Sequence, residues 1–349
     1  MSGEPVFRLF ASCVPVRGAA RSTLCDLQHA RFELIPNGMH EILTEHRGRT
    51  VAEVKAAYGG HFDSVVDEYF DFLVEGGFGF WTREPDAFPD LDLEWERPER
   101  ITNSIVDVGP ASRHDFASIF RQLDDLGCKA IQLRFFRACG VEEANSILRH
   151  ARVGRLRSVE LLIPHAAEWD FAGVERLCAA HPRVSAVFVH SSPEAAPGRP
   201  TATGAHVFYL TDQVDSAWHC GQVHPDYFVV MMEPFTEAQR YNSCLNRKIS
   251  VDEHGEIRNC PALPASFGNV ADTSLHAALA HEEFEALWRI NKDQIDVCRD
   301  CEFRYVCTDC RAFVSDDSDR FSKPSRCAYD PYTAEWASDV PDLHLAATE

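Results

Sequence analysis

Residues 298–310 read CRDCEFRYVCTDC, two CxxC units separated by five residues. A CxxC turn places two sulfurs on one side of a tight bend, so both thiolates can reach one metal ion or one cluster edge at little entropic cost. The last third of the chain adds three more cysteines, Cys244, Cys260 and Cys327. These seven thiolates fall one short of two complete four-ligand sites. The spacing therefore predicts two metal centres, one of which is open or takes a ligand from elsewhere in the chain.

Disulfide bonds are the competing use for so many cysteines. A chain of 349 residues can bury a stabilising core without cross-links. Its first residues, MSGEPVFRLFASCVPVRG, include Glu4 and Arg8 and lack the uninterrupted apolar core of a signal peptide. We therefore expect a cytoplasmic protein whose clustered thiolates bind metal. Four thiolates suit zinc and iron–sulfur clusters alike, so the cysteines alone leave both cofactors open.

The overall charge restricts the partners. With a net charge of −20, the chain is not expected to carry the concentrated basic surface that neutralises nucleic-acid phosphates. The sequence has no run of about 18 apolar residues, so we expect no membrane span. An acidic surface favours basic or neutral partners, although it also simply increases solubility.

Residues 1–97 are predicted to form a small α+β domain. Its strands and helices are expected, in chain order, at 7–10, 31–35, 36–46, from 50, 62–75 and 78–82. Thr50 is the expected N-cap of the second helix. Short strands, three helices and a closing strand are the plan of a winged helix. The stretch EPDAFPDLDLEWERPER at 84–100, rich in Pro and acidic residues, is the expected domain boundary.

Residues 98–237 alternate apolar strands with amphipathic helices. The first four strands and the three helices between them are expected at 101–108, 115–126, 129–135, 141–151, 158–163, 171–180 and 184–190. Two further strands are expected at 206–210 and 227–232. Such alternation predicts an α/β fold with a parallel sheet that is open or partly closed into a barrel. The stretch 191–204 is too rich in Pro and Gly to form a crossover helix.

Residues 238–333 form the predicted cysteine-rich domain, which is followed by a tail at 334–349. A hairpin is expected over 247–258, with its turn at Gly255. A helix capped by one of residues 272–274 should bury apolar side chains as far as Trp288.

The cysteines resemble those of the SPASM domain of peptide-modifying radical enzymes. The resemblance rests on the order of seven residues, Cys244, Gly255, Cys260, Cys298, Cys301, Cys307 and Cys327, and on GNV at 268–270. One departure is that two residues, where the family has three, separate Cys307 from Cys310.

The resemblance implies two [4Fe–4S] clusters. One would be held by Cys298, Cys301, Cys307 and Cys327, and the other by Cys244, Cys260, Cys310 and an unidentified fourth ligand. The candidates for this missing ligand are Cys13, Cys25 and Cys220. The run WHCGQVH around Cys220 is otherwise interpreted as a surface loop and not as a metal site.

Radical enzymes of that family bind S-adenosylmethionine through CxxxCxxC after the first barrel strand. Here the first strand, ITNSIVDV, is followed by GPASRHDF, and no CxxxCxxC occurs in the sequence. We therefore expect a partial (β/α)6 radical SAM-like barrel with no site for S-adenosylmethionine and no radical chemistry. Whether the chain catalyses another step stays open, and no catalytic residue is assigned.

A barrel of this kind joined to a SPASM domain resembles the maturase of grasp-with-SPASM systems. The local runs that carry the resemblance are CDLQ at 25–28, NSIVDV at 103–108 and CEFRYVCTDCRAF at 301–313. It implies a role in ribosomally synthesised peptide (RiPP) maturation. The partners would be a precursor peptide and an ATP-grasp ligase that forms side-chain ester or amide links.

The first domain is similar to the RiPP recognition element, a winged helix that holds the leader of such a precursor. Two alternatives remain open for the whole chain. One is an iron–sulfur redox enzyme acting on a peptide. The other is a zinc-stabilised interaction protein without a redox role.

Overall fold

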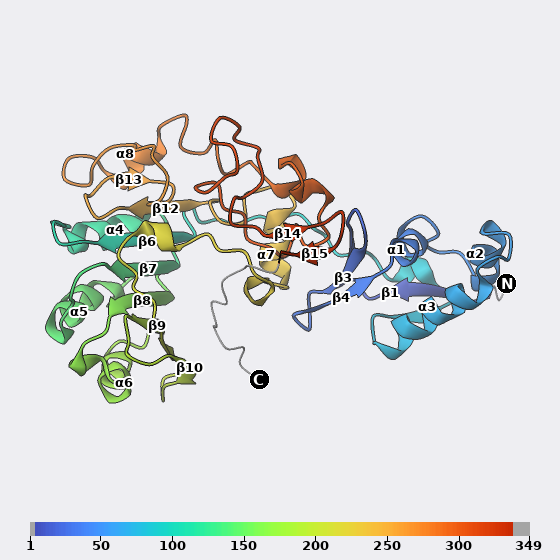
Figure 1. The fold of residues 1–349 in the computed structure, drawn as a ribbon, viewed down its shortest axis with the longest axis horizontal. Helices are drawn as coiled ribbons and strands as arrows, with labels where there is room; N and C mark the ends of the chain where they lie inside the picture. Colours follow the sequence, from blue (N-terminus) through green and yellow to red (C-terminus); the bar gives the residue numbers. More distant parts are fainter. Residues whose placement is uncertain (1–3, 338–349) are drawn as a thin grey trace.

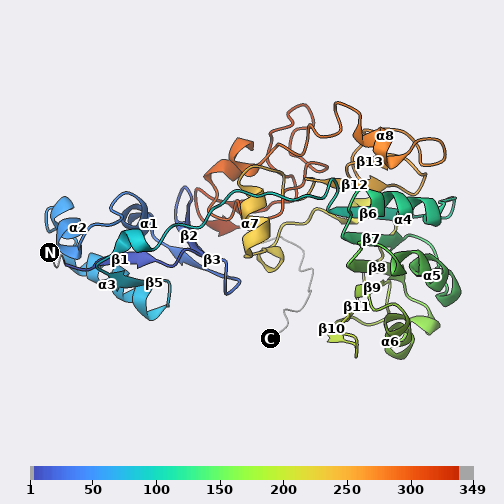
Figure 2. The same cartoon turned by 180° about the vertical axis from the view of Figure 1, so that it is seen from behind.

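The computed structural model describes residues 4–337 as an elongated molecule with three parts (Figure 1). A small α/β unit lies at one end and a large sheet covered by helices lies at the other. The cysteine-rich segment lies between them, as the view from behind also shows (Figure 2). No helix in residues 4–337 is long and apolar enough to cross a membrane.

The N-terminal unit contains two small antiparallel sheets and three helices. Its elements are β1 (Val6–Leu9), β2 (Cys13–Arg17), β3 (Ser22–Asp26), β4 (Arg31–Ile35), α1 (Asn37–Thr44), α2 (Val51–Ala57), α3 (Asp63–Glu75) and β5 (Gly79–Thr82). β1 pairs with β5, and β2, β3 and β4 form a separate sheet in that order. Thr50 caps α2 through a reciprocal capping box with Glu53, as predicted. The helices bury their apolar residues on Leu24, Ile35 and Phe78.

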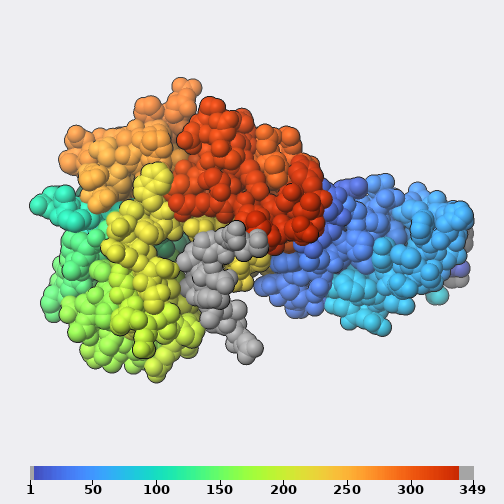
Figure 3. Space-filling model, in the orientation of Figure 1, coloured from blue at the N-terminus to red at the C-terminus, as the bar shows by residue number. Residues whose placement is uncertain are grey.

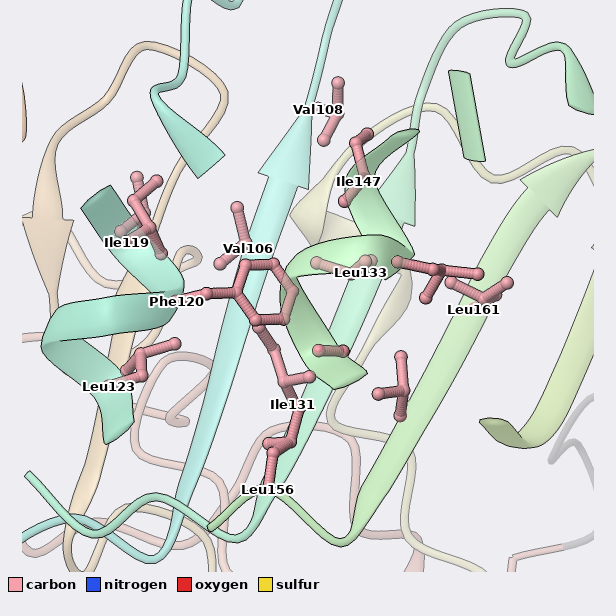
Figure 4. Close-up of a cluster of buried hydrophobic side chains, with 14 of the residues drawn as sticks. Val106, Val108, Ile119, Phe120, Leu123, Ile131, Leu133, Ile147, Leu156 and Leu161 are labelled. Atoms are coloured by element: carbon pink, nitrogen blue, oxygen red, sulfur yellow. The ribbon is translucent and has the colours of Figure 1, made fainter. Parts of the chain in front are cut away.

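The large sheet has the strand order β10-β11-β9-β8-β7-β6-β12-β13. Its first half alternates strands and helices: β6 (Asn103–Val108), α4 (Phe116–Asp125), β7 (Ala130–Phe135), α5 (Val141–Leu148), β8 (Ser158–Pro164), α6 (Phe171–Ala180) and β9 (Val184–His190). These strands run parallel, as the alternation predicted. Figure 4 shows Phe120 of α4 and Ile147 of α5 packed among apolar side chains of β6, β7 and β8. Within residues 4–337 the sheet is open, because β10 and β13 do not pair.

The expected absence of a helix at 191–204 is confirmed. This stretch contains β10 (Ala196–Pro200), which pairs antiparallel with β11 (His206–Tyr209), and β11 extends the parallel run beside β9. The strand predicted at 227–232 is wrong. Its apolar side chains pack against the cysteine-rich segment and do not join a sheet. α7 (Met232–Ala238) begins at the end of that stretch.

The predicted hairpin over 247–258 is confirmed as β12 (Lys248–Val251) and β13 (Ile257–Arg258). β12 also pairs in parallel with β6, so one sheet continues across the boundary expected at 237/238. The helix that follows, α8 (Leu275–Leu279), is capped by Ser274 and ends well before Trp288. A short hairpin of β14 (Tyr329–Asp330) and β15 (Glu335–Trp336) overlaps the predicted tail. The rest of that tail, 338–349, lies outside the described residues.

The sheet of β2, β3 and β4 docks on the CxxC stretch. Thr23 Oγ1 donates to the Glu302 carbonyl at 2.9 Å, and Arg21 Nε lies 2.8 Å from a carboxylate oxygen of buried Glu302. An apolar cluster that includes Val16, Cys25, Phe303 and Cys307 spans the contact. In the space-filling view the blue N-terminal unit adjoins the red C-terminal surface (Figure 3). The cysteines of residues 298–307 therefore lie next to the interface between the two parts.

Candidate metal centres

Four cysteines predicted to share one cluster line a single pocket. They are Cys298, Cys301, Cys307 and Cys327, and the pocket between them is called site A. Cys298 begins a short 3₁₀ turn, and the Cys301 amide donates to the Cys298 carbonyl at 3.0 Å, which closes the first CxxC bend. Cys327 reaches the pocket from the segment before β14. The four cysteines that the family resemblance assigns to one cluster therefore line the same pocket.

Lys292 brings a buried positive charge to site A. Its side chain lines the same pocket, the residue is only 5% exposed, and its Nζ lies 2.8 Å from Cys307 Sγ. Burial alone would lower the Lys292 pKa, but the neighbouring Cys307 and Cys298 raise it above its usual range. Burial in turn raises the pKa of Cys298 to about 11, although Lys292 opposes this shift. A bound metal would displace the thiol protons, and the ammonium would then face thiolates.

The backbone is strained directly before the first ligand of site A. Val297 has φ 66°, in a region that β-branched residues rarely adopt. Such a conformation costs on the order of 1–3 kcal/mol and persists only where surrounding contacts enforce it. The backbone conformation of Val297 directs the chain into the CxxC bend that begins at Cys298.

The second group of cysteines gains a member from the loop after β11. Cys220 and Cys260 shift each other's pKa values, and Cys244 and Cys310 interact electrostatically with the same group of thiols. The Cys220 thiol donates to the Ala217 carbonyl at 3.1 Å. Gly221 brings this loop close to Cys310, because a Cβ at Gly221 would lie 2.8 Å from Cys310 Sγ. We call the four residues Cys220, Cys244, Cys260 and Cys310 site B.

Two cations face site B. Lys248 Nζ lies 3.4 Å from Cys244 Sγ, and Arg134 lies near Cys220. The neighbouring Cys260, Arg134 and Lys248 lower the pKa of Cys220, although burial opposes the shift. The interaction with Cys220 and burial raise the pKa of Cys260 well above its usual range. Both cations therefore favour the thiolate form of Cys220.

Site B lies at the carboxyl ends of the parallel strands. Arg134 stands near the end of β7 and forms a buried bidentate ion pair, at 2.6 and 2.8 Å, with Asp107 near the end of β6. Burial raises the pKa of Asp107 to about 6, although Arg134 opposes the shift. Ligands of open α/β sheets bind at this edge. Site B thus connects the cysteine-rich segment to the edge of the sheet where α/β proteins place their functional sites.

The glycine of the cysteine pattern has a direct steric explanation. Gly255 has φ +86° in the turn between β12 and β13, and a Cβ there would lie 2.8 Å from the Asn269 side chain. Only glycine adopts this conformation without strain or collision. The tight turn carries the chain from β12, which follows Cys244, back toward Cys260.

The two other candidates for the missing ligand are buried, Cys13 in the core of the N-terminal unit and Cys25 in the apolar cluster that includes Phe303 and Cys307. Burial raises the pKa of Cys13 to about 11 and that of Cys25 to about 12. Neither lines the pocket of site A. Within the run WHCGQVH, Cys220 is half-buried, whereas Trp218 and His219 are exposed. The neighbouring His219 and His224 instead pair with Asp215 and Asp226.

Sequence reasoning missed the three cations beside the cysteines, Lys248, Lys292 and Arg134. A signal was present only for Arg134, which stands between Leu133 and Phe135 in AIQLRF. A charged side chain in such a position needs a buried partner. The sequence could not show that Lys248 and Lys292 contact thiols.

The described side chains do not form a site for a single ion. Within residues 4–337, no three His, Cys, Asp or Glu side chains lie close enough together to hold one metal ion. At site A the four thiols line one pocket. In a four-iron cluster each thiolate would bind a different iron.

Comparison with known families supports the iron–sulfur interpretation. Residues 243–302 match the SPASM family, described as an iron-sulfur cluster-binding domain. The match includes Cys244, Cys260, Cys298 and Cys301. No curated protein matches the chain. Residues 243–302 are therefore an iron–sulfur cluster-binding domain, while Cys220, Cys307, Cys310 and Cys327 lie outside the matched range.

Proposed function

We propose that sites A and B each hold one [4Fe–4S] cluster. Cys298, Cys301, Cys307 and Cys327 would bind the first, and Cys220, Cys244, Cys260 and Cys310 the second. The observation that carries this proposal is that each site gathers four cysteines and places a lysine ammonium against one sulfur. A cluster with four thiolates is an anion, and a buried anion requires such compensation. When bound, the clusters would supply electron transfer or structural cross-linking.

We further propose that the chain is an accessory maturase of ribosomally synthesised peptides, in which 1–97 binds a precursor leader. The domains would be 1–97, 98–237 and 238–333, and the chain would cooperate with an ATP-grasp ligase. The edge of the sheet supports a role in binding over radical chemistry. The stretch GPASRHDF directly after β6 contains no cysteine, and the buried Asp107–Arg134 ion pair occupies the strand ends.

Two measurements test this role. Removal of residues 1–97 should abolish saturable binding of a precursor leader, and equal binding by the truncated and intact proteins would contradict the proposal. The intact protein with S-adenosylmethionine and dithionite should release no 5′-deoxyadenosine above a boiled control. Release of 5′-deoxyadenosine would identify an active radical enzyme and overturn the accessory role.

A further inference from the structure

The N-terminal unit contains a cavity of about 590 Å³ that the cysteine sites do not use. It is bounded by β1, the start of β2, the end of α1 and the loop before α2. Its buried lining is apolar and includes Phe7, Ile42, Leu43 and Phe70. Residues 90–93, from the segment that connects this unit to the rest of the chain, form the remaining wall.

Two arginines of this cavity bind one carboxylate of the connecting segment. Arg47 contacts both carboxylate oxygens of Asp90, with Nη1 2.6 Å from Oδ2. Arg8 donates through Nη2 to Asp90 Oδ1 at 3.0 Å and through Nε to the Phe88 carbonyl at 3.1 Å. The forked guanidinium matches a carboxylate in this bidentate geometry. Arg8 and Arg47 thus bind one acidic side chain, and Arg8 also binds the backbone carbonyl two residues before it.

The bound segment has the character of a peptide ligand. Residues 88–94 form no helix or strand. Leu91 and Leu93 are half-buried on an apolar cluster, whereas Asp90, Asp92 and Glu94 are exposed. Acidic and apolar side chains therefore alternate between solvent and protein, as in an extended peptide bound in a groove.

The cavity keeps polar groups that the segment does not satisfy. Arg49 lines it and forms no ion pair within residues 4–337. The buried Nδ1 of His46, another lining residue, has no hydrogen-bond partner in the same range. A longer acidic ligand would pair with groups that residues 88–93 leave free.

We propose that this cavity is a binding site for an extended peptide of alternating acidic and apolar residues, and that residues 88–93 are the resident occupant of its part beside Arg8 and Arg47. An incoming peptide would exchange its own carboxylate for that of Asp90 between Arg8 and Arg47. The site is separate from the free edge of β4, where a peptide would add as a further strand. That the incoming peptide is a precursor leader rests on the proposed function, whereas the site and its occupant do not.

The test uses the full chain and a fluorescent peptide with the sequence of residues 87–95, AFPDLDLEW, followed by fluorescence anisotropy. A tethered occupant competes at an effective concentration that reaches the millimolar range, so wild-type protein should bind the peptide weakly. Asp90→Ala frees the arginines and should tighten binding at least about tenfold. Asp86→Ala removes an exposed acid of the same segment and should leave the affinity at the wild-type value.

Two further measurements test whether binding depends on Arg47 and on the carboxylate of the peptide. Adding Arg47→Ala to Asp90→Ala should return binding to the weak wild-type level or below. The same peptide carrying Asp90→Asn should bind the Asp90→Ala protein at least about tenfold more weakly, because it lacks the carboxylate. Equal affinities of wild-type and Asp90→Ala protein, or of the two peptides, would overturn the proposal. Iron and sulfide contents are measured separately from peptide binding, so loss of a cluster is distinguished from loss of peptide binding.

Discussion

At the scale of single residues, the lysines beside the cysteines distinguish the two sites from ordinary buried thiols. Lys292 contacts Cys307 in site A, and Lys248 contacts Cys244 in site B. Burying an ammonium is costly unless a negative group lies beside it. Each lysine therefore depends on the charge of its site, and the properties of the cluster should depend on each lysine.

Replacement of Lys292 should shift the reduction potential of site A. Lys292→Met removes a positive charge next to Cys307 while keeping an apolar side chain of similar length. Reduction adds negative charge to the cluster, so the potential should fall. Redox titration followed by electron paramagnetic resonance measures the change, and Lys292→Arg should largely preserve the wild-type value. An unchanged potential in Lys292→Met would show that this lysine does not act on a cluster.

Cys220 should be required for site B, although no local spacing marks it. Cys220→Ala removes one thiolate, and we expect about half of the iron to be lost, or the site B signal to change to that of an incomplete cluster. Cys13→Ala, which removes the alternative ligand suggested by the sequence, should retain full iron content. Iron loss in Cys13→Ala with none in Cys220→Ala would reverse the assignment.

At the scale of elements, the apolar pattern of the sequence predicted those helices and strands that are determined by residues close together in the chain. Strands β6 to β9 and helices α4 to α6 appeared because apolar periodicity changes from strand to helix along the chain. β3 was missed because its polar Ser22, Thr23 and Asp26 are buried together with its apolar residues, so no alternation was visible. The stretch 227–232 was mistaken for a strand because its apolar residues pack against another segment. In the sequence, such a run looks the same as a strand buried in a sheet.

The two candidate sites also differ in whether their cysteines lie close together in the sequence. The four cysteines of site A were grouped by the family resemblance, and the CxxC spacing makes Cys298 and Cys301 neighbours in the chain. Cys220 was only one candidate among three, because a residue brought to a site from a distant loop leaves no spacing in the sequence.

The loop that carries Cys220 offers a matched pair of glycine substitutions. Gly221→Ala places a side chain against Cys310 at a residue with φ +84°, whereas Gly204→Ala meets the same φ with no atom within 4 Å. Both should lose about 1 kcal/mol of stability through backbone strain. Only Gly221→Ala should also lose iron from site B, measured as iron per chain after anaerobic reconstitution. Equal iron contents in the two variants would contradict the contact between this loop and Cys310.

Glu237 of α7 should make stability depend on pH. Burial raises its pKa to about 7, although Asn246 donates to its carboxylate at 2.7 Å. The folded state therefore binds this proton more tightly than the unfolded state, so stability should fall as pH rises from about 4.5 to about 7. Glu237→Gln should lessen the fall in thermal midpoint between pH 5 and pH 7.5. Glu68→Gln, at an exposed residue of α3, should keep the wild-type dependence, and an equal effect of both would refute the assignment.

At the scale of the whole molecule, site A and the N-terminal unit share one interface. Thr23 and Arg21 contact Glu302, which directly follows Cys301. A loaded site A would fix this stretch, and an empty one would leave its conformation to the protein alone. Occupancy of site A and docking of the N-terminal unit should therefore be coupled.

Removal of iron should loosen that interface. We expect chelation under reducing conditions to increase the rate of proteolysis within residues 84–100, which connect the two parts. Cys301→Ala should behave like chelated protein, whereas Cys260→Ala, which affects only site B, should have a smaller effect. Identical proteolysis of loaded and iron-free protein would contradict the coupling.

The most direct test of the account counts the metal itself. Protein purified without oxygen should contain about eight iron and eight sulfide ions per chain, with little zinc, and should give a reducible paramagnetic signal. Cys301→Ala and Cys220→Ala should each remove about half of the iron and different parts of the signal. Colourless protein with stoichiometric zinc, or iron that neither substitution lowers, would contradict two clusters at sites A and B.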